Sequence, residues 1–333
     1  MAGRVSVWTD DRLAEVSQHF VPAADETWRL QRGTDPECLH FQGMANQGHY
    51  GKGGGTRQGI YAMAPSGKLL GSVNSLDADR VLTMLQESLD VWEAMPDAER
   101  WLSPDDDLMP EHRWENSFPE RGLVLKSACR DVPADGTPSG ERGTRWNRDH
   151  AWFNAEEARG WLPDTLTVGA TREVSQTVMD RLTGYHLVDN VIGQTIPYAP
   201  SETEASRITS EVVEVAGPRV TLELRGETRA ESDGSWQLGQ NDWTPTDVYP
   251  RAMTTEVLGK ATWDDDLKRF TAFELVALGE RTGRTRFNGR GDDIGPAPIG
   301  FSFRLAPPGP AERVPPAFID IYPAGWVVRP TGS

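Results

Sequence analysis

Long stretches of alternating hydrophobic and polar residues dominate the chain beyond residue 205, and they restrict its fold more than any other feature. In "RVTLELRGE", for example, Val220, Leu222 and Leu224 alternate with polar residues. A period of two predicts strands that bury one face and expose the other. "ITSEVVEV" and "RVTLELRGE" are joined by the turn "GPR", and "MTTEVLGKATW" and "RFTAFELVALG" by "DDDLK", so two long antiparallel hairpins are expected.

The second strand of the later hairpin is apolar on both faces from Phe273 to Leu278, which predicts a strand in the middle of the sheet. Two further strands complete the expected sheet. "PAFIDIYP" is expected to form another strand near the end of the chain, and "GLVLKSACR" forms one further upstream. We expect Cys129, in "GLVLKSACR", to be a small buried residue and not a nucleophile.

Two helices are expected before the hairpins. Asn154 stands three residues before Glu157 in "FNAEEARGWLP", which is the pattern of a capping box. "TREVSQTVMDRLTG" spaces its apolar residues as a helix does, with Gly184 as the expected C-terminal cap. Helices followed by long antiparallel strands predict an α+β domain over residues 119–333, built on a curved sheet or partial barrel.

The first 95 residues follow a different plan. The apolar spacing predicts an amphipathic helix over residues 9–20, capped by Thr9 or Asp10. An extended run, "FVPAAD", comes next, and a short helix is expected from Asp35 with Pro36 at its first position. "RQGIYAMAPSGKLLGSVNS" predicts a hairpin, and "LDADRVLTMLQESLDVW" predicts a closing helix with Asp77 or Ser75 as its cap.

This order of elements resembles the second half of the thioredoxin fold. The segments that carry the resemblance are "FVPAAD" and above all "GIYAMAPSGKLL", and it covers about residues 9–93. The resemblance implies an α/β lobe in which "FVPAAD" is a core strand and Trp28 is a packing residue. The C-x-x-C motif of the family is missing, so a thioredoxin-like lobe without redox activity is expected over residues 1–95.

Composition separates the two regions and limits the partners. Residues 96–118 are acidic and rich in proline, which predicts a linker. A formal net charge of −16 opposes binding to nucleic acid, whose phosphates attract basic surfaces. The chain has no apolar run of the roughly 20 residues that span a bilayer, so we expect no membrane segment and, for the sequence as it stands, a cytoplasmic location. Cofactors and oligomeric state are not indicated.

Three segments of the second region combine ionisable and aromatic residues, as ligand sites do. They are "RWNRDHAWF", "GYHLVDNVIGQT" and "GRTRFNGRGDDIGP". The candidate catalytic residues in them are His150, His186, Asp149 and Asp189. The candidate ligand-binding residues are Arg148, Arg286, Arg290, Asn288, Asp292, Asp293, Trp146 and Trp152. Each segment follows an expected helix or strand end, so we expect the three to meet at one rim of the sheet; local pairing on the surface is the competing expectation.

Two functions follow from these patterns. In the first, the protein is redox-inactive, and its β-rich domain binds a protein partner or a small ligand, an anionic one if the arginines contact it. In the second, the β-rich domain is an enzyme that uses histidine and aspartate for acid–base chemistry or as metal ligands. The sequence does not decide between these two functions, nor whether a metal is bound.

Overall fold

The computed structural model of the chain describes residues 7–23, 27–51, 56–103, 114–133, 146–193, 195–234, 248–285, 288–317 and 319. These residues form two compact units, one within residues 7–103 and one within residues 114–319. Both ends of the predicted linker contain packed residues. The short helix α5 (Asp97–Arg100) bonds back onto the first unit through Arg100, whose guanidinium donates to the Trp92 carbonyl. Trp114 packs in the second unit.

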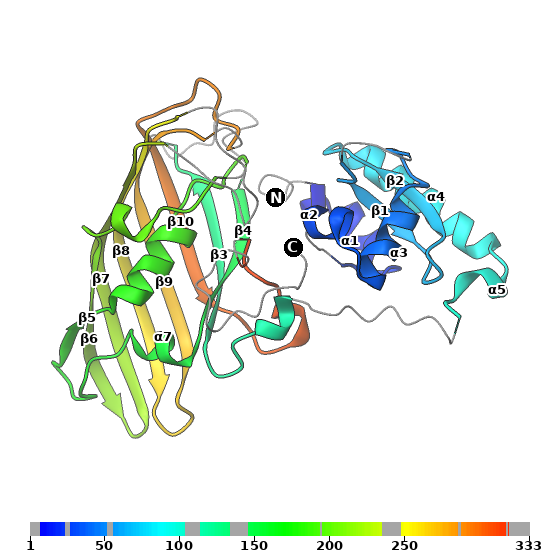
Figure 1. Cartoon of the computed structure of the whole chain (residues 1–333). Helices are drawn as coiled ribbons and strands as arrows, with labels where there is room; N and C mark the ends of the chain where they lie inside the picture. The colour runs from blue at the N-terminus through cyan, green and yellow to red at the C-terminus, as the bar shows by residue number, and fades with distance from the viewer. Residues whose placement is uncertain are drawn as a thin grey trace. The chain divides into compact units, whose positions relative to one another are not determined.

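The first unit contains five helices and a two-stranded antiparallel sheet among its described residues (Figure 1). The strands are β1 (Ile60–Met63) and β2 (Leu69–Val73), which confirms the predicted hairpin. In addition to α5 and the 3-10 turn at Val7–Thr9, the helices are α1 (Asp11–Ser17), α2 (Thr27–Arg32), α3 (Pro36–Ala45) and α4 (Ala78–Ala94). The expected caps are in place, because the side chains of Asp10, Asp35 and Asp77 accept hydrogen bonds from the first turns of α1, α3 and α4.

One predicted element of this unit is wrong. Residues 20–23 have no regular structure, and Val21 is 96% exposed, so the described part of "FVPAAD" is not a core strand. The core consists instead of α1, the hairpin and α4, which meet through Leu13, Ala62, Val81 and Leu85. The side chain of Trp28 lies outside the described residues.

The second unit is built on one eight-stranded antiparallel sheet with the order β4-β3-β10-β9-β8-β7-β6-β5 (Figure 1). Its strands are β3 (Leu123–Asp131), β4 (Trp146–Phe153), β5 (Thr171–Glu173), β6 (Arg207–Ala216), β7 (Arg219–Ser232), β8 (Arg251–Asp264), β9 (Arg269–Gly283) and β10 (Ala297–Leu305). The prediction of an α+β class with a large antiparallel sheet is confirmed. The predicted hairpins are β6–β7 and β8–β9, and β9 is an interior strand as expected. Of the predicted strand "PAFIDIYP", the described residues 316, 317 and 319 form no strand, and residues 318 and 320–323 lie outside the described residues.

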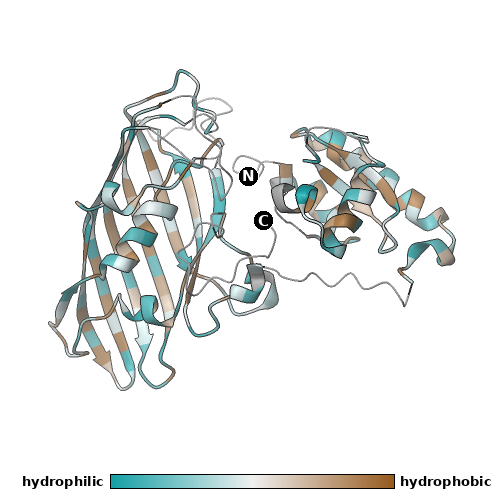
Figure 2. Cartoon of the chain, in the orientation of Figure 1, coloured by the Kyte–Doolittle hydropathy of each residue, from teal (hydrophilic) through white to brown (hydrophobic). Residues whose placement is uncertain are grey.

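Two helices cover one face of this sheet and complete its core (Figure 1). They are α7 (Ala155–Arg159), with the predicted capping box between Asn154 and Glu157, and α8 (Gln176–Arg181). Trp161, just after α7, is fully buried and meets Phe273 of β9 edge to face at 5.1 Å. The alternation along the strands therefore buries one row of side chains beneath the helices. Figure 2 shows the corresponding bands of hydrophobic and hydrophilic residues along the strands.

A π-helix, η3 (Leu182–His186), extends α8 and corrects the predicted helix end. Gly184 lies inside this π-helix and is not the C-terminal cap. Its role is close approach: a Cβ at Gly184 would come within 2.8 Å of the Tyr198 carbonyl oxygen, and the Tyr198 N–H donates to the Gly184 carbonyl at 2.9 Å. The start of the predicted helix is also wrong, because residues 171–173 form strand β5.

Candidate functional site

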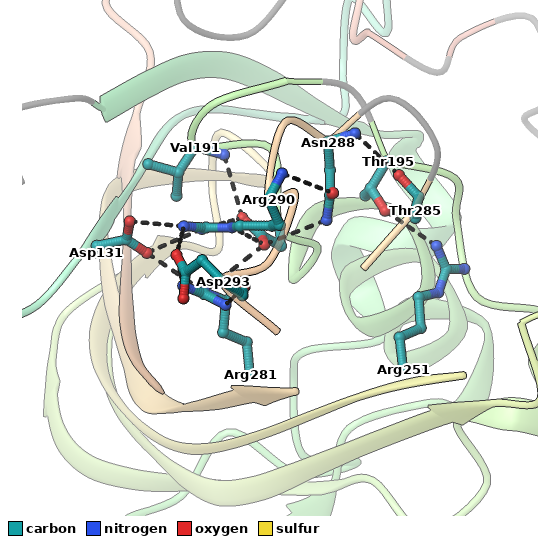
Figure 3. Close-up of polar contacts among 10 residues, drawn as sticks. Asp131, Val191, Thr195, Arg251, Arg281, Thr285, Asn288, Arg290 and Asp293 are labelled. Atoms are coloured by element: carbon teal, nitrogen blue, oxygen red, sulfur yellow. Dashed lines mark hydrogen bonds and ion pairs between the residues drawn. The ribbon is translucent and has the colours of Figure 1, made fainter. Parts of the chain in front are cut away.

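The centre of the polar network at one end of the sheet is Arg290, which is fully buried (Figure 3). A guanidinium has five N–H donors. Both carboxylate oxygens of Asp189 accept from Arg290, at 2.6 Å each, and both oxygens of Asp131 accept at 2.8 and 2.9 Å. Asp293 accepts the fifth bond at 3.3 Å. Burial alone would lower the pKa of Arg290, but the bonds to Asp189 and Asp131 outweigh that effect and raise it.

Arg281 joins the same cluster from strand β9 (Figure 3). Its guanidinium lies 2.7 Å from Asp293 and 3.5 Å from Asp131. The cluster therefore links the end of β3, the segment after the π-helix and the segment after β9. We call these five residues, Asp131, Asp189, Arg281, Arg290 and Asp293, the arginine clasp. Because every donor of Arg290 is already bonded to the protein, the contacts favour a structural role for Arg290 over binding of an anion.

A third buried arginine, Arg251, lies beside the clasp without a carboxylate within salt-bridge distance among the described residues. Its guanidinium donates to the Thr195 hydroxyl and the Pro197 carbonyl, each at 3.0 Å, and lies 4.4 Å from the centre of the Tyr198 ring. Burial lowers the pKa of Arg251. The same burial raises the pKa of Tyr198 to about 12.

A small cleft opens between the π-helix and the inner row of β3 and β4, which is the row of side chains on the face of the sheet that the helices cover. Its free volume is about 10 Å³, which is the room that one water molecule needs. Its lining is mostly polar and comes from β3, β4, β10 and the π-helix with the residues after it. The lining residues are Ser127, Ala128, Cys129, Asn147, Asp149, Tyr185, His186, Val188, Asn190 and Phe301.

Asp149 is the acidic side chain of the cleft. Burial raises the pKa of Asp149 to about 6, although its Oδ1 accepts the backbone N–H groups of His150 at 2.8 Å and Ala317 at 3.0 Å. A carboxyl group with such a pKa changes its protonation state close to neutral pH. Groups of this kind occur often at functional sites.

The imidazole of His186 and the thiol of Cys129, which also line the cleft, are uncharged near neutral pH. Burial, with a contribution from the charge of Arg181, lowers the pKa of His186 to about 3, so its imidazole is neutral. Burial also raises the pKa of Cys129 well above its usual range. The prediction that Cys129 is a buried residue is confirmed, and its thiol is a poor nucleophile at neutral pH.

The predicted site residues divide into three groups. Asp189, Asn288, Arg290 and Asp293 meet at the clasp, where the Asn288 amide lies 3.5 Å from Asp189. Asp149 and His186 meet at the cleft. The remaining described candidates belong to neither group: Trp146, Arg148, His150, Trp152 and Asp292.

Strand alternation explains why four of these remaining residues miss the cleft. Even-numbered residues of β4 point away from the inner row, which holds Asn147 and Asp149. On that other face, Arg148 lies 4.3 Å from the Trp146 ring, and the His150 imidazole lies 3.0 Å from Glu312. Trp152 is fully buried in a separate cluster with Trp114, Val124 and Ile319.

Two predicted residues remain. Asp292 is exposed and makes no ion pair with any residue that the structure describes. Arg286 lies outside the described residues.

Sequence reasoning missed most of the cleft lining. Ser127, Asn147 and Tyr185 are uncharged and carry no motif. Asn147 could have been found from the strand pattern, because it stands two residues before Asp149 and therefore on the same face. Two strands that line the cleft were not predicted: β10, which contributes Phe301, and β4, because "RWNRDHAWF" was expected to follow the end of an element and instead forms a strand itself.

No group of three His, Cys, Asp or Glu side chains that could hold a metal ion occurs in the described ranges. No described helix is long and apolar enough to cross a membrane. No protein-family model, no curated protein and no solved structure matches the chain.

Proposed function

We propose that the β-rich unit binds a small molecule in the cleft beside the π-helix. The observation that carries this proposal is the joint position of Asp149 and His186, from different elements, on one opening lined by hydrogen-bonding groups. π-Helices are rare and occur frequently at functional sites. The free volume of about 10 Å³ limits the ligand, because only one group of about the size of a water molecule fits inside and the rest of the ligand lies outside the opening.

A blocked cleft tests this proposal. Ser127→Met fills the cleft from β3, and Ser302→Met is the matched control, because Ser302 stands next to the lining residue Phe301 and so on the opposite face of β10. Binding of acetamide, methylurea, methylguanidinium and acetate is followed by amide chemical shifts. We expect shifts around Asn147 and Asn190 that Ser127→Met abolishes and Ser302→Met retains. Equal shifts in both variants would place binding elsewhere and contradict the proposal.

A second candidate is an acid–base enzyme that uses Asp149. The raised pKa of Asp149, about 6, favours it, because a general base works best with a pKa near the working pH. 5-Nitrobenzisoxazole is a suitable probe, since its ring opens when a base removes one ring proton. Enzymatic activity requires a rate that rises through about pH 6 and is lost in Asp149→Asn. A rate equal to that of Asp149→Asn counts against catalysis by this residue.

We further propose that the first unit is a thioredoxin-like lobe without redox activity. The expected helices and the hairpin support this, although residues 20–23 do not form the strand that the resemblance implies. Cys38 is the one cysteine of this region; it is buried, and its Sγ lies 3.1 Å from Asp35 Oδ2. We expect the protein to reduce insulin no faster than its Cys38→Ser variant. Reduction that depends on Cys38 would contradict the proposal.

A further inference from the structure

The hydrogen bonds of Asp149 leave one carboxylate oxygen for a ligand. Oδ1 accepts the N–H groups of His150 and Ala317. Oδ2 accepts no hydrogen bond from the described residues, and Asp149 lines the cleft. Oδ2 is not among the fully buried side-chain atoms without a partner, so solvent can reach it and a bound molecule can donate an N–H group to it in place of water.

The charges around Asp149 favour a positive donor. None of the ten residues that line the cleft is a lysine or an arginine, and Asp149 is the one acidic residue among them. The nearby cation Arg181 is paired with Glu157 at 2.8 Å and donates to the Trp152 carbonyl. His186 stays neutral. An ionised Asp149 therefore has no positive partner on the walls of the cleft.

The remaining walls suit a small organic cation. Phe301 supplies an aromatic ring and Val188 adds apolar surface, whereas the ring of Tyr185 already has the guanidinium of Arg181 6.0 Å from its centre. Ser127 and Asn147 supply oxygen atoms that can accept further N–H groups. The free volume of about 10 Å³ admits one N–H group of such a cation, and the rest of the molecule lies outside the opening.

We infer that the cleft binds a small organic monocation with N–H donors, an ammonium or guanidinium group, and that Asp149 is its anchor. This inference rests on the proposed function, because it names the ligand class of the same cleft. A free amine and the side chain of an arginine-containing peptide share this chemistry. Each would place one N–H group on Oδ2 of Asp149.

The test compares molecules of equal shape and different charge on the wild-type protein. Methylguanidinium and methylurea differ mainly in charge, and acetate has the opposite charge. At neutral pH we expect methylguanidinium to bind at least about tenfold more tightly than methylurea, which corresponds to about 1.4 kcal/mol. Amide shifts should centre on Asn147 and Asn190 and saturate with the probe concentration. Because the comparison uses one protein, it does not depend on the folding of any variant.

Asp149→Asn then tests the anchor. The amide oxygen can still accept the two backbone N–H groups, so the fold should be kept, and the preference for methylguanidinium should disappear. Asp164→Asn, at an exposed site whose side chain is 85% accessible, is the control for loss of one charge and should retain the preference. A persistent preference in Asp149→Asn overturns the role of Asp149.

The outcomes separate the inference from the proposed function. If methylurea or acetate binds the cleft as tightly as methylguanidinium, the inference is wrong and the proposed function stands. If no probe shifts the cleft amides, both are wrong. Acetyl-arginine amide distinguishes the sources: tighter binding than methylguanidinium supports a peptide ligand, and equal binding supports a free small cation.

Discussion

Replacement of Arg290 tests most directly whether the arginine clasp holds the β-rich unit together. Arg290→Met keeps the aliphatic stem and removes all five N–H donors. The three carboxylates of the clasp are then left with Arg281 alone, whose distances to Asp293, Asp131 and Asp189 are 2.7, 3.5 and 3.8 Å. The clasp thus changes from two positive and three negative groups to one positive and three negative groups.

The expected loss follows from the burial of these charges. Removal of one partner from a buried ion pair costs about 3–5 kcal/mol, because the other partner stays buried without its counter-charge. The five bonds are not added separately, since they belong to one network. For a unit of this size, about 2–4 °C of melting temperature corresponds to each kcal/mol, so the unit should melt about 6–20 °C lower.

Calorimetry with two further variants completes the experiment. Arg225→Met is the matched control, because Arg225 is 71% accessible and pairs with Glu223 in solvent; we expect a change within about 0.5 kcal/mol. Arg290→Lys keeps the charge but has fewer donors, and it should fall between wild type and Arg290→Met. If Arg290→Met has the same melting temperature as Arg225→Met, the clasp adds no net stability and the structural role of Arg290 is refuted.

Three other predictions concern the core and the cleft. Trp161→Ala should destabilise the β-rich unit by about 3–5 kcal/mol in urea denaturation, because it leaves a cavity between α7 and β9; a loss below about 1 kcal/mol would contradict the packing. Because the folded pKa of Asp149 is raised from 3.8 to about 6, stability should fall as pH rises through that window, and Asp149→Asn should remove this slope. The opposite sign holds for His186, because its folded pKa is lowered from 6.5 to about 3. Stability should therefore be lost as the pH falls below 6.5, and His186→Gln should weaken that loss. If the pH dependence of stability is unchanged in both variants, neither pKa is perturbed in the folded protein.

Local patterns were sufficient to predict most elements of this chain. The period of two identified β6 to β9, and the capping residues Asp10, Asp35, Asp77 and Asn154 marked where helices begin. These features depend on neighbours within a few residues, so the sequence contains the whole physical cause. The failures lie where local preference competes with distant contacts. Gly184 looks like a helix cap but lies in a π-helix, where it gives the backbone of Tyr198 room to approach.

The site depended on the tertiary structure. The sequence places ionisable residues in three segments but does not show which side chains pair with one another, so from the sequence Arg290 could bind an anion or be a structural residue. In the structure its bonds to Asp131, Asp189 and Asp293 favour the structural role. Because side chains alternate along strand β4, Asp149 and its neighbour His150 lie on opposite faces of the sheet. Only the fold brings Asp149 to the same cleft as His186, because strand β4 and the π-helix are distant in sequence and meet through packing of the core.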